Sequence, residues 1–194
     1  LQFLRLARIV HGLSAAAFQE TPCVFASINP NSPREYDESM LWGMIECALA
    51  GQALMISPFI LAGAMAPSSL AGALTQQNAE ALAGIAFCQM VRAGTPVAYG
   101  GFVSNADMKS GAPAFGTPEH VKTTLVIGQM ARHYGLPYRA ANANASNAVD
   151  AQAAYESQMC LWACLVSGAT YVYHGLGWLE GGLRASIEKF VVEA

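Results

Sequence analysis

The chain has 194 residues, of which 54% are hydrophobic and only 12% are charged, and its formal net charge is −3. This length suffices for one domain with a sizeable core, so we expect residues 1–194 to form a single domain. The ten Lys and Arg residues are scattered along the chain, which excludes the basic stripe that a nucleic-acid partner requires for its phosphates.

The most apolar segment, residues 47–67, contains no charged side chain. Gly51, Ser57-Pro58 and Gly63 interrupt it, so we interpret it as a helix end, a strand and a loop and not as a membrane-spanning helix. The five cysteines form no CxxC pair, which is typical of reduced, buried thiols in a cytoplasmic protein and not of disulfides or a zinc site. Because the chain starts at Leu1 inside an apparent helix, we expect that a preceding part of the protein is missing.

Five short apolar segments recur along the chain, and the first four begin with a proline. Proline is tolerated at the first residue of a strand, where its missing N–H costs little. We therefore expect strands near residues 22–28, 57–63, 96–100, 137–141 and 170–174. Their starting residues are Pro22, Pro58, Pro96, Pro137 and Thr170, which are 36, 38, 41 and 33 residues apart. Each interval accommodates one strand, one loop and one helix, which indicates repeated β/α units.

The segments between these strands carry the start signals of helices. Thr117-Pro118-Glu119 combines an N-cap threonine, a proline at the first helical position and an acid in the first turn. We expect that helix to continue to about His133. The other helices are expected near residues 33–50, 69–92 and 149–166, with a further helix that opens near Gly182.

Alternating strands and helices predict a parallel sheet, either an open doubly wound sheet or a (β/α)₈ barrel. The long βα loops at residues 100–116 and 175–181 favour the barrel, in which functional residues lie at the carboxyl ends of the strands. A complete barrel has eight strands and about 250 residues, whereas five strands are expected here. The fold class is therefore α/β, a partial (β/α)₈ barrel of about five parallel units. Its open edges favour association, so we expect a homo-oligomer.

Polar and aromatic side chains gather at or just after the expected strand ends, which meet at one face of a barrel. The position of His174 directly after the fifth strand favours a functional role over a structural one. Several other strand-end residues have structural alternatives to a functional role. The asparagines within 142–147 fit ordinary turn chemistry, and Asp107 and Lys109 fit a solvated loop pair. Glu180 fits a helix cap. The strand-end residues are Asn29, Asn31, Met65, Tyr99, Asn105, Asp107, Lys109, Asn142, Asn144, Asn147, His174, Trp178 and Glu180.

Several short motifs between about residue 20 and residue 194 are specific in combination. They are Phe59–Met65, Gln76–Gly84, Gly94–Gly100, Asp107–Gly111 with Gly116–Glu119, Asp150–Glu156, and His174–Glu180 with Glu188–Val191. In these motifs the chain resembles the trimethylamine methyltransferase family of corrinoid-dependent enzymes. The resemblance implies a (β/α)₈ barrel of about twice this length, of which this chain would be a fragment. It also implies an enzyme that moves a methyl group from a methylated amine to the Co(I) centre of a separate corrinoid protein.

Members that act on trimethylamine resemble one another in carrying pyrrolysine inside the barrel, and this chain has none in the corresponding region, residues 140–147. Homologues without pyrrolysine are associated with quaternary amines such as glycine betaine. A quaternary amine is already activated, because its leaving group is a neutral tertiary amine, and its site needs no acid. Such a site needs aromatic faces around the cation and an open line of attack for cobalt.

These considerations assign residues to roles, although none of them is identified as catalytic. The expected cation box consists of Tyr99, Phe102, Tyr173 and Trp178 with Glu180. The substrate carboxylate is expected at His174 with Asn142 or Arg139, and the loop of Asn105, Asp107 and Lys109 is expected to face the corrinoid protein. We expect the chain itself to bind no metal, flavin or nucleotide.

Two alternatives belong to other classes. One is a non-catalytic binding module for betaine-like cations, with an aromatic box but no turnover. The other is a lyase or aldolase, which would need a catalytic lysine at a strand end, and none of the five expected strands contains a lysine. Methyl transfer assayed on the full-length protein separates the methyltransferase from the binding module.

Overall fold

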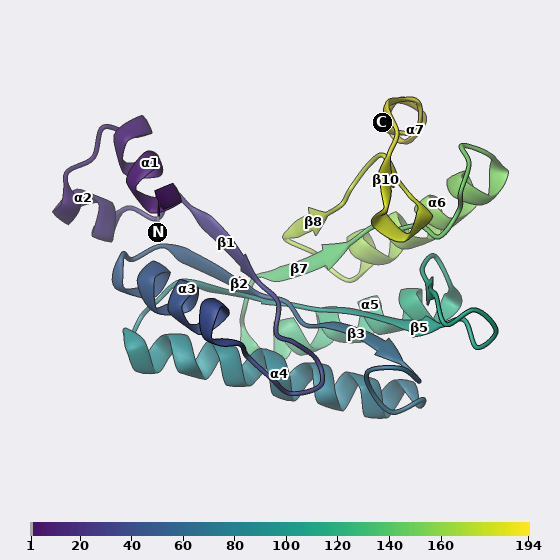
Figure 1. The fold of residues 1–194 in the computed structure, drawn as a ribbon, viewed down its shortest axis with the longest axis horizontal. Coiled ribbons are helices and arrows are strands. Elements are labelled where there is room, and N and C mark those ends of the chain that lie inside the picture. The colour runs from purple at the N-terminus through teal and green to yellow at the C-terminus, as the bar shows by residue number, and fades with distance from the viewer. Residues whose placement is uncertain (1) are drawn as a thin grey trace.

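The computed structural model of the chain describes residues 2–194, which form repeated β/α units (Figure 1). The helices are α1 (Gln2–Val10), α2 (Ala15–Glu20), α3 (Glu38–Leu49), α4 (Leu70–Val91), α5 (Pro118–Tyr134), α6 (Ala151–Val166) and α7 (Ile187–Glu193), with a 3₁₀ turn η1 (Glu180–Gly182). The strands are β1 (Phe25–Ile28), β2 (Ala53–Ile56), β3 (Phe59–Ala62), β4 (Val97–Gly100), β5 (Phe102–Ala106), β6 (Pro113–Ala114), β7 (Tyr138–Ala141), β8 (Tyr171–Tyr173), β9 (Trp178–Leu179) and β10 (Arg184–Ala185).

The main sheet has the strand order β1-β2-β4-β7-β8, and all four pairings are parallel. The predicted parallel order of five units is therefore confirmed. The sheet is also strongly curved, because the rings of Phe25 on β1 and Tyr171 on β8 lie 6.0 Å apart, centroid to centroid. In a flat sheet these outer strands would be about 19 Å apart, whereas five neighbouring strands of an eight-stranded barrel span a diameter of about 15 Å. At that separation the rings of Phe25 and Tyr171, which both point inward, can meet. The five strands therefore form about half of a barrel.

The second unit begins earlier in the chain than its proline suggests. The strand expected at residues 57–63 was wrong at its start, because β2 (Ala53–Ile56) makes the pairings in the main sheet. Pro58 lies in the middle of an extended segment and separates β2 from β3, since it has no N–H to donate to the ladder. Its carbonyl oxygen accepts a hydrogen bond from the Phe102 N–H at 2.9 Å, and a second sheet of order β3-β5-β6 continues beyond the break.

The long helices begin where a side chain can accept a backbone N–H. Asp37, Ser69, Thr117 and Asp150 are the N-caps of α3, α4, α5 and α6. The helix expected at 33–50 was therefore wrong at its first turn, because residues 31 and 35 form an isolated antiparallel bridge ahead of the Asp37 cap. The helix expected to open near Gly182 was also wrong at its start. The hairpin of β9 and β10 precedes it, and α7 begins only after Ser186.

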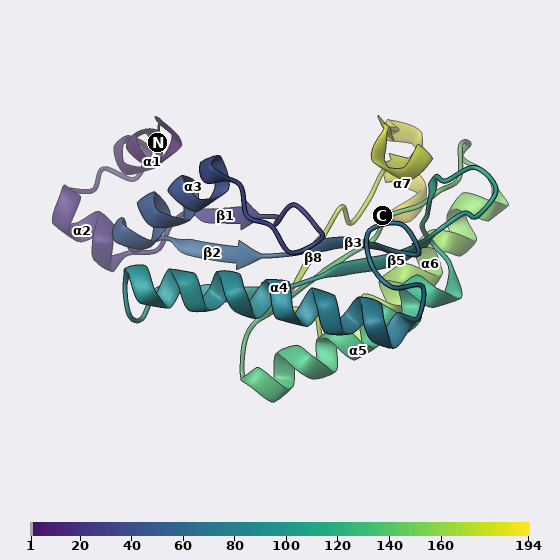
Figure 2. The same cartoon turned by 60° about the horizontal axis from the view of Figure 1, so that its bottom comes forward.

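The helices α3, α4, α5 and α6 pack on the outer face of the sheet (Figures 1 and 2). Alternate strand residues point into this layer, and Leu54, Ile56, Tyr99, Tyr138 and Ala140 belong to its buried clusters. In both views α7 lies on the other side of the strands, whereas Leu4 of α1 belongs to the same buried cluster as Leu54 and Ile56. The sheet is thus covered on one side by helices, as in one part of a barrel wall.

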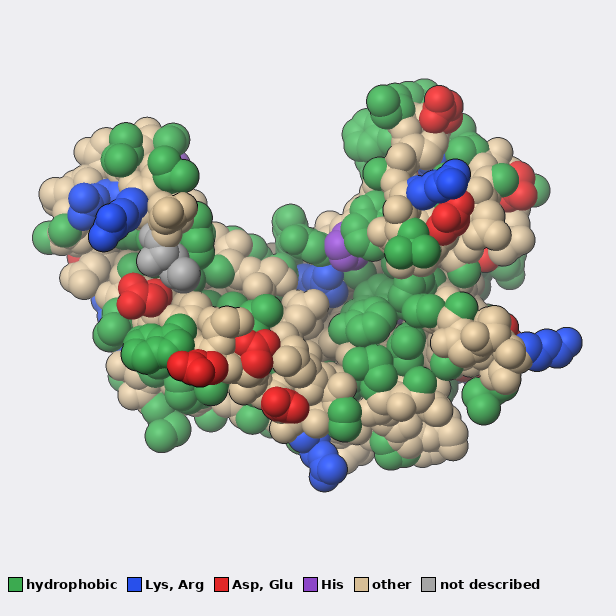
Figure 3. Space-filling view, viewed as in Figure 1, with side chains coloured by type: hydrophobic (Ala, Val, Ile, Leu, Met, Phe, Trp, Pro, Cys, Tyr) green, Lys and Arg blue, Asp and Glu red, His purple; other side chains and the backbone are tan. Residues whose placement is uncertain are grey.

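The inner face of the sheet is exposed at its two edge strands, whereas Met55, Ala98 and Arg139 on the central strands are buried. Figure 3 shows a trough between the lobe that contains α1 and α2 and the lobe that contains α7. Phe25 and Tyr171, the aromatic residues that meet across this face, are exposed, and β1 and β8 form the edges of the main sheet. None of the helices in residues 2–194 is both long enough and apolar enough to cross a membrane.

Candidate functional site

A cavity of about 210 Å³ lies at the carboxyl ends of the parallel strands. In a β/α fold this end carries the functional loops. A cavity of this size suits a small molecule, because drug-sized ligands occupy about 300 Å³ or more. Its lining residues are Asn29, Ser57, Phe59, Phe102, Pro113, Phe115, Arg139, Ala143, His174, Trp178 and Gly181.

Arg139 supplies a buried positive charge to this cavity. It lies on β7 between Tyr138 and Ala140, which point to the helices, so strand alternation turns Arg139 inward. The residue is only 5% exposed, and its guanidinium carbon lies 4.7 Å from the centroid of the Tyr173 ring. Burial lowers the pKa of Arg139 to about 10, so the guanidinium is still charged at neutral pH.

Two residues that line the cavity carry a buried donor without a partner. Within residues 2–194, Ser57 Oγ and Arg139 Nε are among four buried side-chain polar atoms without a hydrogen-bond partner. Buried polar groups in proteins are nearly always hydrogen-bonded, and an exception points to a missing ligand or solvent partner. The strand-end pattern did not select Ser57, and the signal available for it is the polar residue directly before the proline that interrupts the strand.

His174 and Trp178 form one wall of the cavity. His174 follows β8 with a φ of +53°, in the left-handed region, and its ring centroid lies 3.6 Å from that of Trp178. Burial, and then the charge of Arg139, lower the pKa of His174 to about 4. At neutral pH the imidazole is therefore uncharged and can donate one N–H and accept one hydrogen bond.

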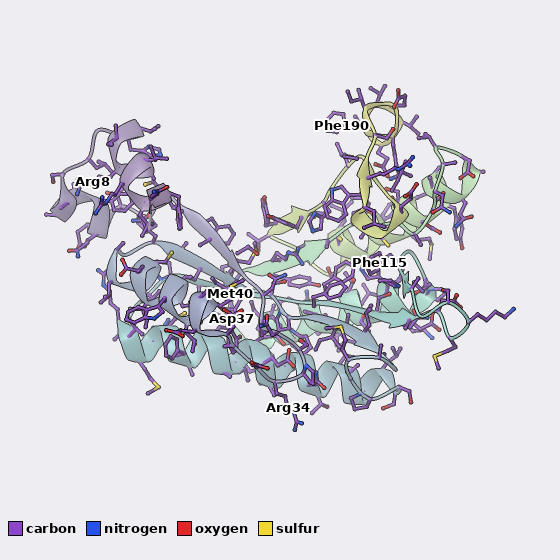
Figure 4. All side chains as sticks on the ribbon, viewed as in Figure 1. Arg8, Arg34, Asp37, Met40, Phe115 and Phe190 are labelled. Carbon is purple, nitrogen blue, oxygen red and sulfur yellow. The ribbon has the colours of Figure 1, made fainter. Side chains whose placement is uncertain are left out.

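Three phenylalanines, Phe59, Phe102 and Phe115, form the opposite wall, which we call the phenylalanine cluster. Phe59 and Phe102 stack at 5.4 Å, and Phe115 meets Phe102 edge-on at 4.9 Å. Phe115, labelled in Figure 4, also lies close to the C-terminal segment, since a Cβ on Gly181 would be 3.3 Å from its ring. Sequence patterns selected Phe102 as a site residue but not Phe59 or Phe115. The only signal for Phe59 is that it follows the proline that breaks the strand, and the only signal for Phe115 is that it lies just before the helix cap Thr117.

Buried carboxylates fix the loops around the cavity. Glu80 on α4 accepts a hydrogen bond from the backbone N–H of Arg34, in the loop that follows Asn29, at 2.8 Å. Glu156 on α6 accepts from the backbone N–H groups of Ala145 at 2.9 Å and Ser146 at 3.0 Å. Each carboxylate thereby satisfies loop donors that would otherwise be unpaired, which holds the loop in one conformation.

Three of the residues expected at the site lie elsewhere. Tyr99 points to the outer face, where its hydroxyl donates to Asn78 Oδ1 at 2.8 Å, and it is fully buried there. Asn142 Nδ2 donates to Ser157 Oγ at 2.8 Å and to the Gly175 carbonyl at 2.9 Å, so Asn142 supports the loop behind His174.

The third residue, Glu180, forms an ion pair with Arg184 at 3.2 Å. It lines an adjacent cavity of about 500 Å³ that shares Pro113 and Gly181 with the first. The structure thus brings Phe102, Arg139, His174 and Trp178 together, with Tyr173 beneath Arg139.

The loop after β5 reaches the rim of the adjacent cavity. Asp107 lines that cavity and also organises the loop, since its carboxylate accepts the backbone N–H of Lys109 at 3.2 Å and that of Ser110 at 3.1 Å. The hydroxyl of Ser110 also donates to this carboxylate, and this hydrogen bond, followed by the two backbone ones, lowers the pKa of Asp107. Asn105 accepts a hydrogen bond from the hydroxyl of Thr117 at 2.8 Å, and Lys109 is exposed.

The cysteines are thiols, and four of the five are buried. Cys160 lies 3.5 Å from Nδ1 of His120, a contact between two helices that spacing alone does not reveal. Burial raises the pKa of Cys160 to about 12 and lowers that of His120 to about 4, so both groups are neutral. Among the described residues, no three His, Cys, Asp or Glu side chains are grouped so that they could hold a metal ion.

Comparison with known proteins places this geometry in a family. The family model described as trimethylamine methyltransferase matches residues 2–194. A glycine betaine methyltransferase of Desulfitobacterium hafniense is 41% identical over 98% of this chain and 40% of its own length. A trimethylamine methyltransferase of Methanosarcina acetivorans is 33% identical over 84% of this chain and 33% of its own length. A proline betaine:corrinoid methyltransferase of Eubacterium limosum is 30% identical over 90% of this chain and 36% of its own length. The chain spans two fifths or less of the length of these relatives.

Proposed function

The chain belongs to the trimethylamine methyltransferase family, and we propose that the protein transfers a methyl group from a carboxylate-bearing quaternary amine to a corrinoid. Glycine betaine is the simplest such substrate, and the corrinoid is carried in its Co(I) state by a partner protein. The name of one relative, a glycine betaine methyltransferase, supports the substrate. The name of another, a proline betaine:corrinoid methyltransferase, supports the acceptor.

The buried charge of Arg139 is the observation that carries the choice of substrate. A cation without a carboxylate, placed about 5 Å from this guanidinium, would be repelled by about 3 kcal/mol at an effective dielectric constant of about 20. A zwitterion avoids this repulsion, because its carboxylate can accept hydrogen bonds from Arg139 Nε and Ser57 Oγ, two donors without partners on residues that line the cavity. These contacts would be charge-assisted and therefore strong.

The aromatic walls suit the other end of a betaine. Trp178 and the phenylalanine cluster line the same cavity as Arg139, and aromatic faces attract a quaternary ammonium by up to about 2 kcal/mol when both are desolvated. The face of Tyr173 is already occupied by the guanidinium of Arg139, so Tyr173 steadies the anion-binding end. Neutral His174 lies between the two ends, and its N–H can donate to the carboxylate.

No side chain has to supply a proton in this reaction. The Co(I) centre of the partner's corrinoid supplies the electron pair for the new bond to the methyl carbon, while the C–N pair stays on nitrogen and leaves a neutral tertiary amine. The cavity residues bind the zwitterion at both ends, exclude water and align the C–N bond, and alignment alone can lower a barrier by about 7 kcal/mol or more. The loop of Asn105, Asp107 and Lys109 borders the adjacent cavity and is the surface that we assign to the corrinoid protein.

The test is methyl transfer by the full-length protein to its reduced corrinoid protein, followed through the visible absorption of the corrinoid. Glycine betaine, trimethylamine and tetramethylammonium are supplied in parallel. We expect methylation with glycine betaine and at least tenfold slower methylation with the other two. Binding of glycine betaine without methyl transfer would identify a binding module instead, and methylation by trimethylamine alone would refute the assignment of Arg139.

A further inference from the structure

The C-terminal helix α7 buries a lysine and exposes its apolar residues. Lys189 is 1% exposed, whereas Ile187 is 81% and Val191 is 70% exposed. A buried ammonium is costly unless it is paired and hydrogen-bonded. The position of Lys189 is therefore set by specific polar contacts and not by the packing of an apolar helix face.

Lys189 connects two loops at the carboxyl ends of the strands. Its ammonium donates a hydrogen bond to Oδ1 of Asn144, in the loop after β7, and forms an ion pair with Glu193 one turn along α7. The other carboxylate oxygen of Glu193 accepts the backbone N–H of Gly177, in the loop after β8, at 2.6 Å. Lys189 thus contacts the loop after β7 directly, through Asn144, and the loop after β8 through the carboxylate of Glu193.

Further contacts keep these segments in register. The Gly181 N–H donates to the Asn144 carbonyl at 2.8 Å, and the Ser186 N–H donates to the Gly177 carbonyl at 2.8 Å. Gly177 has a φ of +83°, and a Cβ there would lie 3.2 Å from the Ser186 carbonyl oxygen. The backbone at Gly177 is therefore held tightly against the start of α7, one residue before Trp178.

The two connected segments carry opposite ends of the candidate site. Arg139 lies on β7, ahead of the loop that contains Asn144, whereas His174 and Trp178 lie on the segment that Glu193 holds. Lys189 itself does not line the cavity. We propose that Lys189 is a positioning residue that fixes the separation between the Arg139 guanidinium and the Trp178 indole, and so the length of the zwitterion that is accepted. This proposal rests on the proposed function.

The test compares Lys189→Met in the full-length protein with a matched control, Lys122→Met, which removes an exposed lysine on α5. Both are made in a background with Trp42→Phe and Trp162→Phe, two exposed tryptophans, so that within residues 1–194 Trp178 alone remains. Steady-state kinetics are measured with glycine betaine and with 4-(trimethylammonio)butanoate, in which two additional methylenes separate the charges. Emission and acrylamide quenching of Trp178, taken as the difference from the same protein with Trp178→Phe, are recorded at a temperature at which far-UV circular dichroism shows both variants folded.

We expect Lys189→Met to reduce kcat/KM for glycine betaine about tenfold or more, since a misplacement of about 1 Å can cost on the order of 100-fold. The kcat/KM for the longer betaine should fall less, so that the ratio of kcat/KM for glycine betaine to kcat/KM for the longer betaine falls. Trp178 should also become more accessible to acrylamide. Lys122→Met should change none of these. An unchanged ratio with unchanged Trp178 quenching in folded Lys189→Met would overturn the proposal.

Two variants keep the test decisive if Lys189→Met does not fold, because that change leaves the buried Glu193 carboxylate unpaired. The double variant of Lys189→Met with Glu193→Gln contains no unpaired buried charge at this position. Glu193→Gln alone leaves the Lys189 ammonium without its carboxylate but keeps its hydrogen bond to Asn144. Both should show the same fall in the kcat/KM ratio, and an unchanged ratio in both would contradict the proposal. If the parent protein bound neither betaine, the proposed function would fail, whereas the quenching of Trp178 would still decide whether Lys189 positions this segment.

Discussion

Replacing Arg139 by methionine should separate binding from stability, because binding should weaken while the free energy of unfolding stays level or rises. Methionine has a similar length and no charge, so the change removes the guanidinium while it keeps much of the side-chain volume. If the guanidinium binds a substrate carboxylate, removing one partner of this buried pair costs about 3–5 kcal/mol of binding free energy. The affinity for glycine betaine should therefore fall by roughly 100-fold or more.

The free protein should not lose stability in the same variant. Burial lowers the pKa of Arg139 from its usual high value to about 10. The unfolded chain therefore holds the proton more tightly, so the charged form costs about 3 kcal/mol of stability at every pH below about 10. Loss of the contact with the Tyr173 ring offsets this by about 1–2 kcal/mol. The free energy of unfolding should accordingly stay level or rise by up to about 2 kcal/mol.

Titration calorimetry with glycine betaine and urea unfolding at pH 7.5 measure the two effects on the full-length protein. Arg184→Met is the control, since Arg184 in the β10 strand is exposed and pairs only with Glu180 in the described structure. A variant of Arg139 that binds glycine betaine normally and unfolds at least 2 kcal/mol more easily would show that the guanidinium is structural.

Three further outcomes are expected from the structure. Trp178→Ala should weaken binding of every quaternary amine by about 1–2 kcal/mol, whereas His174→Ala should weaken betaines and leave tetramethylammonium unaffected; equal losses in calorimetry would contradict these roles. Gly128→Ala should lower the free energy of unfolding by about 1–3 kcal/mol, because its Cβ would overlap the Ser167 carbonyl. The control Gly43→Ala, which meets nothing within 4 Å on α3, should raise it by about 0.5–1 kcal/mol. The free energy of unfolding should be at its full value above pH 6.5 and decrease towards pH 4. The cause is that burial lowers the pKa of His120 from 6.5 to about 4, so the unfolded chain takes up the proton first. Urea titrations of His120→Met should show a shallower pH dependence than the parent protein, and the same pH dependence in both would refute this cause.

The repeated units were predictable because each one uses local signals. The strands β4 and β7 begin directly after Pro96 and Pro137, as the prolines suggest. A proline fits there because the first residue of a strand needs no N–H partner. Pro58 gave the wrong boundary because the same missing N–H also fits a break inside a longer extended segment. Sequence alone does not distinguish these cases, because the pairing of Ala53–Ile56 with two other strands is a long-range property.

The site was only partly predictable because strands in a β/α barrel are covered on both faces. Tyr99 and Arg139 lie on neighbouring strands, yet one points to the helices and the other into the cavity. Apolar residues on both faces remove the alternation that would reveal which side is inward. Ser57 and Phe115 reach the cavity through the break in a strand and through a loop, and neither placement is encoded locally.

The most direct measurement is the affinity of the full-length protein for glycine betaine relative to choline. Both ligands carry the same trimethylammonium group, and choline has a hydroxyl in place of the carboxylate. If the guanidinium of Arg139 and the hydroxyl of Ser57 hold a carboxylate, titration calorimetry should show glycine betaine binding about 100-fold more tightly, from about 3 kcal/mol of charge-assisted hydrogen bonding. Equal affinities, or tighter binding of choline, would contradict a carboxylate site in this cavity.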